Sequence, residues 1–75
     1  MEITAICNGK ATVIRNGGEQ ILVSYSTEVC RYDGSTFVRI GRGIRTDSQT
    51  TMRHINYFRG LIGLPKITKS QWNKM

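Results

Sequence analysis

The 75-residue sequence is poor in proline, cysteine and histidine, and each scarcity excludes a class of protein. One proline beside eight glycines excludes collagen-like and proline-rich chains. The two cysteines, Cys7 and Cys30, are too few for a disulfide framework, so we expect free thiols. No run approaches the ~18 apolar residues of a membrane span, and no secretory signal is visible. We therefore expect a cytoplasmic protein without a membrane partner.

The chain also has few residues that carry catalysis or bind metals. His54 is the only histidine, and no motif places a nucleophile, an acid or a pocket beside it. Cys7 and Cys30 with one histidine match no zinc-ligand spacing. A thiolate pair between one cysteine and His54 is the remaining catalytic alternative. We predict no enzyme, no catalytic residue, no metal and no cofactor.

What the sequence does have is a globular composition, with 39% hydrophobic and 21% charged residues. This balance excludes a disordered chain, and the length fits a single domain over residues 1–75. So small a domain retains little net stability, so dimerisation or partner binding can matter to it, and both monomer and homodimer stay open.

Positive charge is concentrated in the second half of the chain. Residues 1–37 hold three Lys or Arg and four Asp or Glu, whereas residues 38–75 hold eight Lys or Arg and only Asp47. The formal net charge of +6 therefore arises from the C-terminal half.

The first half reads as β-strands. Glu2–Cys7 and Lys10–Arg15 are rich in strand-forming residues, and Asn8-Gly9 between them is a strong hairpin signal because both residues tolerate positive φ. Asn16-Gly17-Gly18 predicts another turn. Residues 21–30 then alternate with a period of two, as one long strand or as two with a bend near residues 24–26.

Asp33-Gly34 predicts a second two-residue hairpin turn. That register places Tyr32 opposite Ser35 and Glu28 opposite Arg39, where the last two could form an ion pair. It also places Thr27, Val29, Val38 and Ile40 on one face with Ile21 and Val23. We expect this face to be the core, with these residues at its centre: Val29, Val38, Ile40, Met52, Ile55 and Phe58.

The period changes to that of a helix in the second half. Asp47 or Ser48 can cap a helix that ends at Gly60 or Gly63. Thr68-Lys69-Ser70-Gln71 fits a capping box for a short second helix, whose Trp72 should pack on the domain. The predicted fold is α+β, a small antiparallel sheet covered on one face by a C-terminal helix, with a short terminal helix. The other face is then solvated or buried in an interface.

The arginines are the main candidates for binding. Arg39, Arg42 and Arg45 recur every three residues just before the helix, and their planar guanidinium groups suit phosphates and carboxylates equally. Aromatic residues that could stack with bases are Tyr25, Tyr32, Phe37 and Tyr57. The predicted partner-binding residues are Arg39, Arg42, Arg45, Arg53, Arg59 and Lys66.

The loop Gly41-Arg42-Gly43-Ile44-Arg45 is rich in glycine but lacks the P-loop and Rossmann patterns. Two interpretations stay open: backbone N–H groups and two arginines that cradle a phosphate, or a turn that links sheet to helix.

Two segments resemble a family of short bacteriophage proteins of unknown function. They are Ser24-Tyr25-Ser26-Thr27-Glu28-Val29 and Thr51-Met52-Arg53-His54-Ile55-Asn56-Tyr57-Phe58, with the short turn Tyr32-Asp33-Gly34 between them. The pattern is S-Y-x-T-x-V, a short turn, then T-x-x-H-I-N-x-F, within residues 20–60. The resemblance implies a strand-rich domain closed by a helix and transfers no site residue. It also implies a setting in the host bacterial cytoplasm, where short phage proteins often bind one host protein, such as a polymerase or a CRISPR effector.

These features favour a small non-enzymatic binding protein that inhibits a host protein, as an anti-defence, anti-CRISPR-like or host-takeover inhibitor. Its partner would present an acidic surface or a nucleic-acid-binding groove. The alternative is a small basic nucleic-acid-binding module in which Arg42, Arg45, Arg53 and Lys66 contact phosphates.

Overall fold

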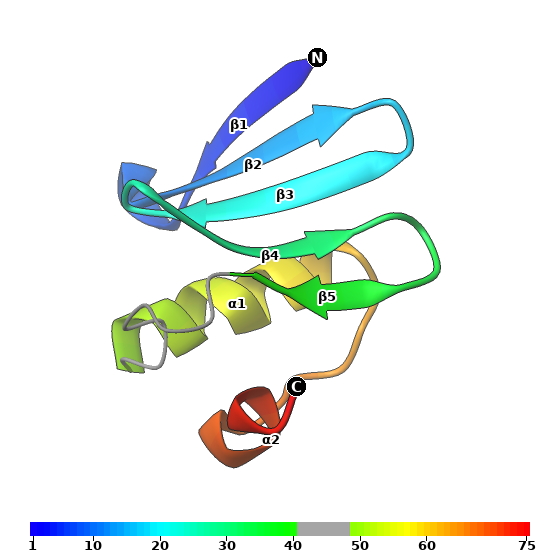
Figure 1. Ribbon diagram of the computed structural model, residues 1–75. Helices are drawn as coiled ribbons and strands as arrows, with labels where there is room; N and C mark the ends of the chain where they lie inside the picture. The colour runs from blue at the N-terminus through cyan, green and yellow to red at the C-terminus, as the bar shows by residue number, and fades with distance from the viewer. Residues whose placement is uncertain (41–48) are drawn as a thin grey trace.

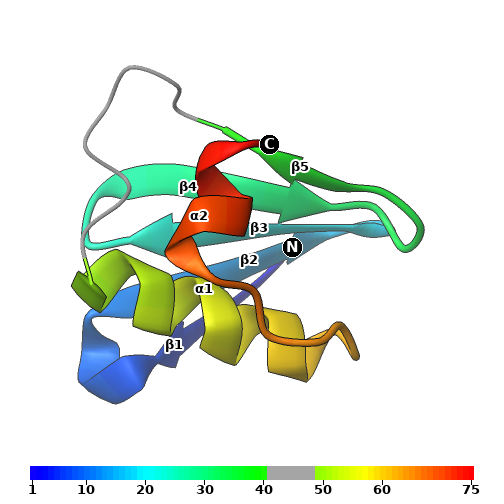
Figure 2. The same cartoon turned by 90° about the horizontal axis from the view of Figure 1, so that it is seen from below.

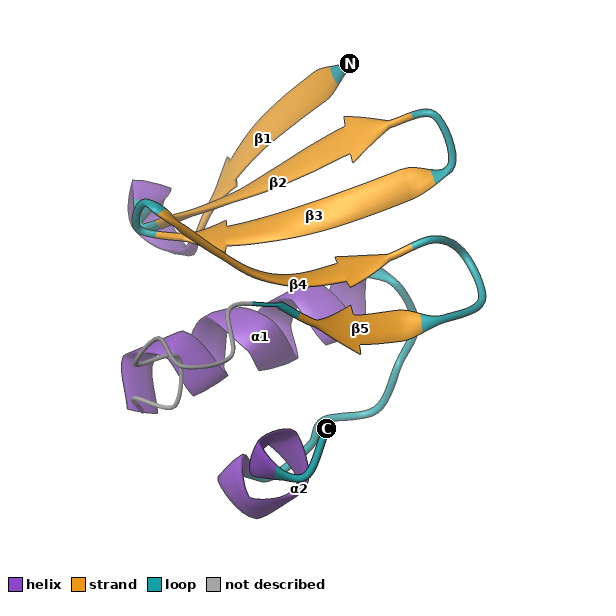
Figure 3. Cartoon of the chain, in the orientation of Figure 1, coloured by secondary structure: helices purple, strands orange, loops and turns teal. Residues whose placement is uncertain are grey.

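The computed structural model, which describes residues 1–40 and 49–75, has one antiparallel sheet with two α-helices against the same face (Figures 1 and 2). The strands follow one another in chain order across the sheet (Figure 3). The elements are β1 (Glu2–Ile6), the 3-10 turn η1 (Cys7–Gly9), β2 (Ala11–Asn16), β3 (Glu19–Ser24), β4 (Thr27–Tyr32), β5 (Phe37–Arg39), α1 (Gln49–Leu61) and α2 (Lys69–Asn73). The predicted α+β class is confirmed.

The first hairpin forms as its sequence predicts. Asn8 and Gly9 have φ of 59° and 82°, the left-handed region that asparagine and glycine tolerate best. The Lys10 N–H donates to the Cys7 carbonyl at 3.1 Å and closes the turn. The β2–β3 turn has only two residues, Gly17-Gly18, between the paired positions, since Asn16 faces Glu19.

The period-two run is divided into two strands. Ser24 faces Thr27, and Tyr25 takes φ of 56° at the turn between them. Of the two interpretations, two strands joined by a bend is therefore correct, and the bend is a tight hairpin.

The register of the last hairpin was predicted wrongly. Tyr32 faces Phe37 rather than Ser35, so the loop has four residues, Asp33–Thr36. The Asp33 carboxylate accepts hydrogen bonds from the backbone N–H groups of Ser35 at 3.0 Å and Thr36 at 2.7 Å, which stabilises the longer loop.

This shift removes the expected Glu28–Arg39 pair. Arg39 lies opposite Cys30, and Glu28 lies opposite Val23 on the other side of β4. Glu28 and Arg39 are therefore not cross-strand neighbours.

The core face was also predicted wrongly. In β3 the buried side chains are Leu22 and Ser24, whereas Ile21 and Val23 are only half-buried on the opposite face. Period two identifies two faces, but both are apolar here, so alternation alone cannot choose between them. A register irregularity between β3 and β4 adds to the difference, since it leaves both Val29 and Cys30 buried.

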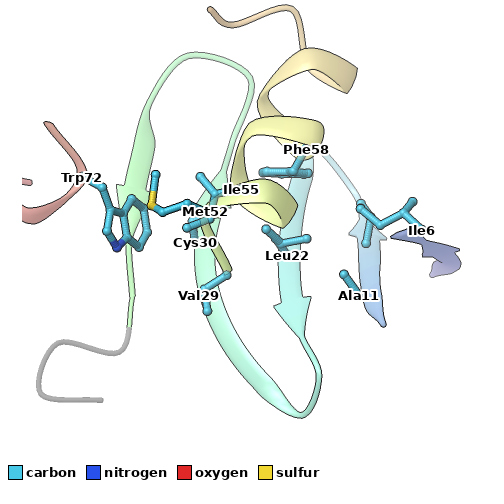
Figure 4. Packing of buried hydrophobic residues seen from close by; sticks show 10 residues of the cluster. Ile6, Ala11, Leu22, Val29, Cys30, Met52, Ile55, Phe58 and Trp72 are labelled. Carbon is cyan, nitrogen blue, oxygen red and sulfur yellow. The ribbon is translucent and has the colours of Figure 1, made fainter. Parts of the chain in front are cut away.

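The core joins the inner face of the sheet to α1 and α2 (Figure 4). Val29, Met52, Ile55 and Phe58 are buried as predicted, whereas Val38 is 39% exposed; Ile40 is half-buried. The complete buried cluster is Ile6, Ala11, Val13, Leu22, Val29, Cys30, Met52, Ile55, Phe58 and Trp72.

The C-terminal end of α1 and the N-terminal end of α2 follow their sequence signals. Gly63 has φ of 82°, and the Leu64 N–H donates to the Arg59 carbonyl at 2.8 Å, so α1 ends with a Schellman-type cap. Thr68 and Gln71 form the predicted capping box of α2, which buries Trp72 completely. The predicted caps of α1, Asp47 and Ser48, lie outside the described residues. Neither helix of the described chain has the length and apolar character needed to cross a membrane.

Candidate functional site

A hollow of about 300 Å³ lies beside the outward side of α1. Its lining residues are Arg53, Asn56 and Tyr57 from α1 and Lys66 from the segment that follows. Arg53 and Lys66 are exposed, and Tyr57 is 52% exposed. The structure thus brings together two of the predicted partner-binding cations and one predicted stacking residue.

The backbone around Lys66 is held against α1 on both sides. The Arg59 Nε donates to the Pro65 carbonyl at 2.7 Å. The Asn56 side chain donates to the Ile67 carbonyl at 3.0 Å and accepts from the Ile67 N–H at 2.9 Å. Because both neighbours of Lys66 are fixed, its backbone is preorganised beside Arg53 and Tyr57.

Arg39 and Arg59 have a different environment. The Arg39 guanidinium lies 4.9 Å from the ring centre of Trp72 and donates to the Trp72 carbonyl at 2.9 Å. Arg59 is 8% exposed, and its guanidinium lies 4.6 Å from the ring centre of Phe37. These cation–π and hydrogen-bond contacts join β5 and the C-terminal segment to the core, so they favour a structural role for both arginines.

Arg42 and Arg45 lie outside the described residues, as does the whole glycine-rich loop of residues 41–45. Their predicted contacts with a partner or a phosphate stay predictions.

The predicted stacking residues also separate. Tyr57 borders the hollow, whereas Phe37 packs edge-on against Trp72, with ring centres 6.4 Å apart. The Tyr32 hydroxyl donates to the Gly34 carbonyl at 2.9 Å, and the Tyr25 ring packs against His54. Tyr57 is therefore the one of these four that the structure places beside the exposed cations of the hollow.

Sequence reasoning missed Leu61 and Asn56. Leu61 is 49% exposed and follows Arg53 and Tyr57 at four-residue spacing, so the three share one side of α1. That spacing is visible in the sequence and would have identified the stripe. The role of Asn56 depends on a contact with Ile67, which no local pattern predicts.

Ser24 and His54 are the one pair in the described chain that resembles a nucleophile and its base. The Ser24 hydroxyl and the His54 Nδ1 lie 2.7 Å apart, but the residues are only 4% and 3% exposed. The Tyr25 ring lies 5.6 Å from the imidazole, centre to centre. Burial first, and the positive charge of Lys10 second, lower the pKa of His54. A buried hydrogen-bonded pair of this kind favours a structural role, in which it holds α1 against β3.

The cysteines are free, with Cys30 buried and Cys7 half-buried. Burial raises the pKa of Cys30 to about 12, and the positive charge of Arg59 acts in the opposite direction. Thiols with raised pKa values are poor nucleophiles. Within residues 1–40 and 49–75, no three His, Cys, Asp or Glu side chains are grouped as metal ligands.

The face of the sheet away from the helices is mostly apolar. One row across it contains Ile3, Ile14, Ile21, Arg31 and Val38, and the next contains Ala5, Thr12, Val23 and Glu28. We call this surface the open face. Ile3 is 64% exposed and Val38 39%, and both described α-helices lie on the other face of the sheet (Figure 2).

No curated protein and no solved structure matches the chain. A family model matches residues 1–74, which is nearly the whole sequence. The chain therefore belongs to this family, which is described as a family of unknown function (DUF8033).

Proposed function

We propose that this domain is a non-enzymatic binding protein that inhibits a host protein by docking the outward side of α1 on an acidic surface. The observation that carries the proposal is one hollow that the exposed Tyr57 lines together with two cations, Arg53 and Lys66. We call Arg53, Tyr57, Leu61 and Lys66 the α1 surface.

The composition of the α1 surface supports a protein partner. Tyrosine and arginine are the residue types that dominate the binding energy of protein interfaces, usually around an apolar centre. Leu61 supplies exposed apolar area next to Tyr57. The anchored backbone at Lys66 reduces the entropy lost on binding.

Charge supports an acidic partner. The described carboxylates belong to the sheet and its loops, namely Glu2, Glu19, Glu28 and Asp33. Within the described residues, the ion pair with a nitrogen–oxygen distance of 4 Å or less is Arg15–Glu2, at 2.8 Å. Arg53 and Lys66 therefore have no carboxylate partner among the described residues. Complementary charge would accelerate association and make it sensitive to salt.

A nucleic-acid partner is the second candidate, and the same hollow supports it less well. Proteins that bind duplex DNA through phosphates commonly neutralise about 6–10 of them. Arg39 and Arg59 are held by internal contacts, which leaves Arg53 and Lys66 at the hollow. An exposed leucine also contributes little to phosphate binding.

The inhibitory role and the setting rest on the resemblance to short bacteriophage proteins. We propose that the protein acts in the host bacterial cytoplasm, by occupying a surface that a polymerase or a defence nuclease needs. Absence of catalysis is part of the proposal, since the buried Ser24–His54 pair offers a substrate no access.

Affinity capture with matched variants tests the proposal. Wild type, the double variant Arg53→Glu with Tyr57→Ala, and the control Lys69→Glu in α2 are used as baits in host lysate, with and without nuclease. We expect one host protein that survives nuclease, is retained by the control and is lost with the double variant. The captured protein should then bind the purified domain directly, and more weakly as salt increases. Capture of nucleic acid alone would favour the second candidate, and equal capture by all three baits would contradict both.

A further inference from the structure

The open face is the largest feature that the proposed function leaves unused. Antiparallel sheets commonly carry polar residues on the face that meets water. Here the alternate positions of β1, β2 and β3 hold Ile3, Ile14 and Ile21, in register across three neighbouring strands. Contiguous apolar patches of this kind mark interaction surfaces.

We propose that the open face binds a second copy of this chain, so that two sheets stack face to face in a symmetric dimer. This inference is independent of the α1 surface, which lies on the other side of the molecule and is left accessible in such a dimer.

Charge favours a second copy over an acidic partner. The chain has a formal net charge of +6, but the strands place only Glu19, Glu28 and Arg31 as charged residues on this face. Glu2 and Arg15 lie on the inner face and pair with each other at 2.8 Å. The open face is thus close to neutral, so two copies can meet there with their excess positive charge directed outward.

The two rows of the face are complementary under a two-fold rotation. A two-fold axis that lies between the sheets and runs across the strands places each row over the other row of the partner copy. Ile3 then lies over Ala5 of the second copy, and Ile21 over Val23, so larger side chains meet smaller ones.

The same operation pairs the charges. Arg31 and Glu28 occupy the two rows at β4, since Arg31 faces Ile21 and Glu28 faces Val23. Arg31 of each copy therefore lies over Glu28 of the other, twice by symmetry. Both residues are exposed in the single chain, and in the described structure they have no ion pair with each other.

The size of the face predicts a dimer that dissociates on dilution. Five strands at ~4.8 Å and about five residues each at ~3.3 Å give a footprint of roughly 20 by 17 Å. Two such footprints total roughly 700 Å², below the usual size of stable specific interfaces, so the dimer should be weak.

Sedimentation equilibrium from micromolar to submillimolar concentration tests the proposal. The wild type should approach twice the 8.5 kDa of one chain. Ile21→Lys should weaken association by about 100-fold or more, because it buries an unpaired charge. Ile21→Leu should associate as the wild type does. Ser70→Lys, at an exposed position of α2 outside both surfaces, is the control and should leave the dimer intact.

A charge exchange keeps the test valid if Ile21→Lys fails to fold. Glu28→Arg and Arg31→Glu should each weaken the dimer, and the combined variant should restore it. Circular dichroism should show a folded chain throughout. A wild type that stays monomeric overturns the proposal and would leave the face to another protein. The proposal is also overturned if neither Ile21→Lys nor the charge variants change the affinity of the dimer, since association would then use another surface, such as the edge of β1. Sedimentation tests only the dimer. The proposed binding role of the α1 surface is tested separately, by affinity capture from lysate.

Discussion

The Ser24 hydroxyl and the His54 Nδ1 lie 2.7 Å apart across the interface between β3 and α1. One residue opens the S-Y-x-T-x-V segment, and the other belongs to T-x-x-H-I-N-x-F. Residues 24–29 and residues 51–58 therefore meet in space at this pair. Because both side chains are buried, the contact fixes how the helix lies on the sheet.

Removal of the Ser24 hydroxyl should destabilise the fold. Ser24→Ala leaves a buried imidazole nitrogen without its partner, which costs about 1–3 kcal/mol. Urea unfolding measures the change, and Ser26→Ala at the exposed turn position is the control. Equal stability of the two variants would show that the hydrogen bond contributes nothing.

Stability should decline as pH falls below 6.5. The pKa of His54 is lowered from 6.5 in the folded state, chiefly by burial, so the unfolded chain binds more protons just below that pH. The free energy of unfolding therefore rises with pH through this window. The stabilisation linked to His54 is fully present above pH 6.5. Urea unfolding between about pH 5 and 7 covers the window, because carboxyl groups ordinarily titrate below it. His54→Gln should flatten the dependence; an equal slope in both proteins would contradict the assignment.

The core contact of α1 should be costly to truncate. Ile55 is fully buried, and Ile55→Ala should cost about 2–5 kcal/mol. Ile3→Ala, at a position that is 64% exposed in the single chain, is the control and should cost far less in dilute protein. A cost below about 1 kcal/mol for Ile55→Ala would mean that α1 packs differently.

How far the sequence predicts the fold is clear from three pairs of residues. Asn8-Gly9 and Thr68-Gln71 act through neighbours in sequence, and both formed the predicted structures. Leu22 and Ile21 are equally apolar, so the choice of inner face depends on where α1 docks. That docking is a long-range contact, and local periodicity contains no information about it.

Arg53 and Arg59 should behave differently although both lie on α1. Arg59→Ala removes a charged hydrogen bond to Pro65 and the packing on Phe37, so it should cost about 1.5–3 kcal/mol. Arg53→Ala changes an exposed side chain and should stay within about 0.5 kcal/mol of the wild type. Thermal or urea unfolding of both variants checks this, and similar values would contradict the division into structural and surface arginines.

The positive charge of the candidate site could be predicted from the sequence, but the arginines that belong to it could not. Sequence spacing treats Arg39, Arg53 and Arg59 alike, because it contains no information about which guanidinium meets a ring. Trp72 is distant in sequence from Arg39, and Phe37 is distant in sequence from Arg59. The contacts Arg39–Trp72 and Arg59–Phe37 therefore arise only in the folded chain.

The two thiols should differ in reactivity. The pKa of Cys30 is raised to about 12 by burial, so iodoacetamide at neutral pH should modify it only after unfolding. Cys7 is half-buried and should react first. Mass spectrometry of digested protein separates the two sites; equal rates in the folded protein would mean that Cys30 is accessible.

Photo-crosslinking from position 57 tests the central claim most directly. A photoreactive amino acid replaces Tyr57 in the α1 surface, and the same residue replaces Ser70 in α2 as a control. After irradiation in nuclease-treated host lysate, we predict one discrete protein adduct from position 57 and none from position 70. Adducts with nucleic acid alone in untreated lysate, or equal protein adducts from both positions, would contradict a protein-binding surface on α1.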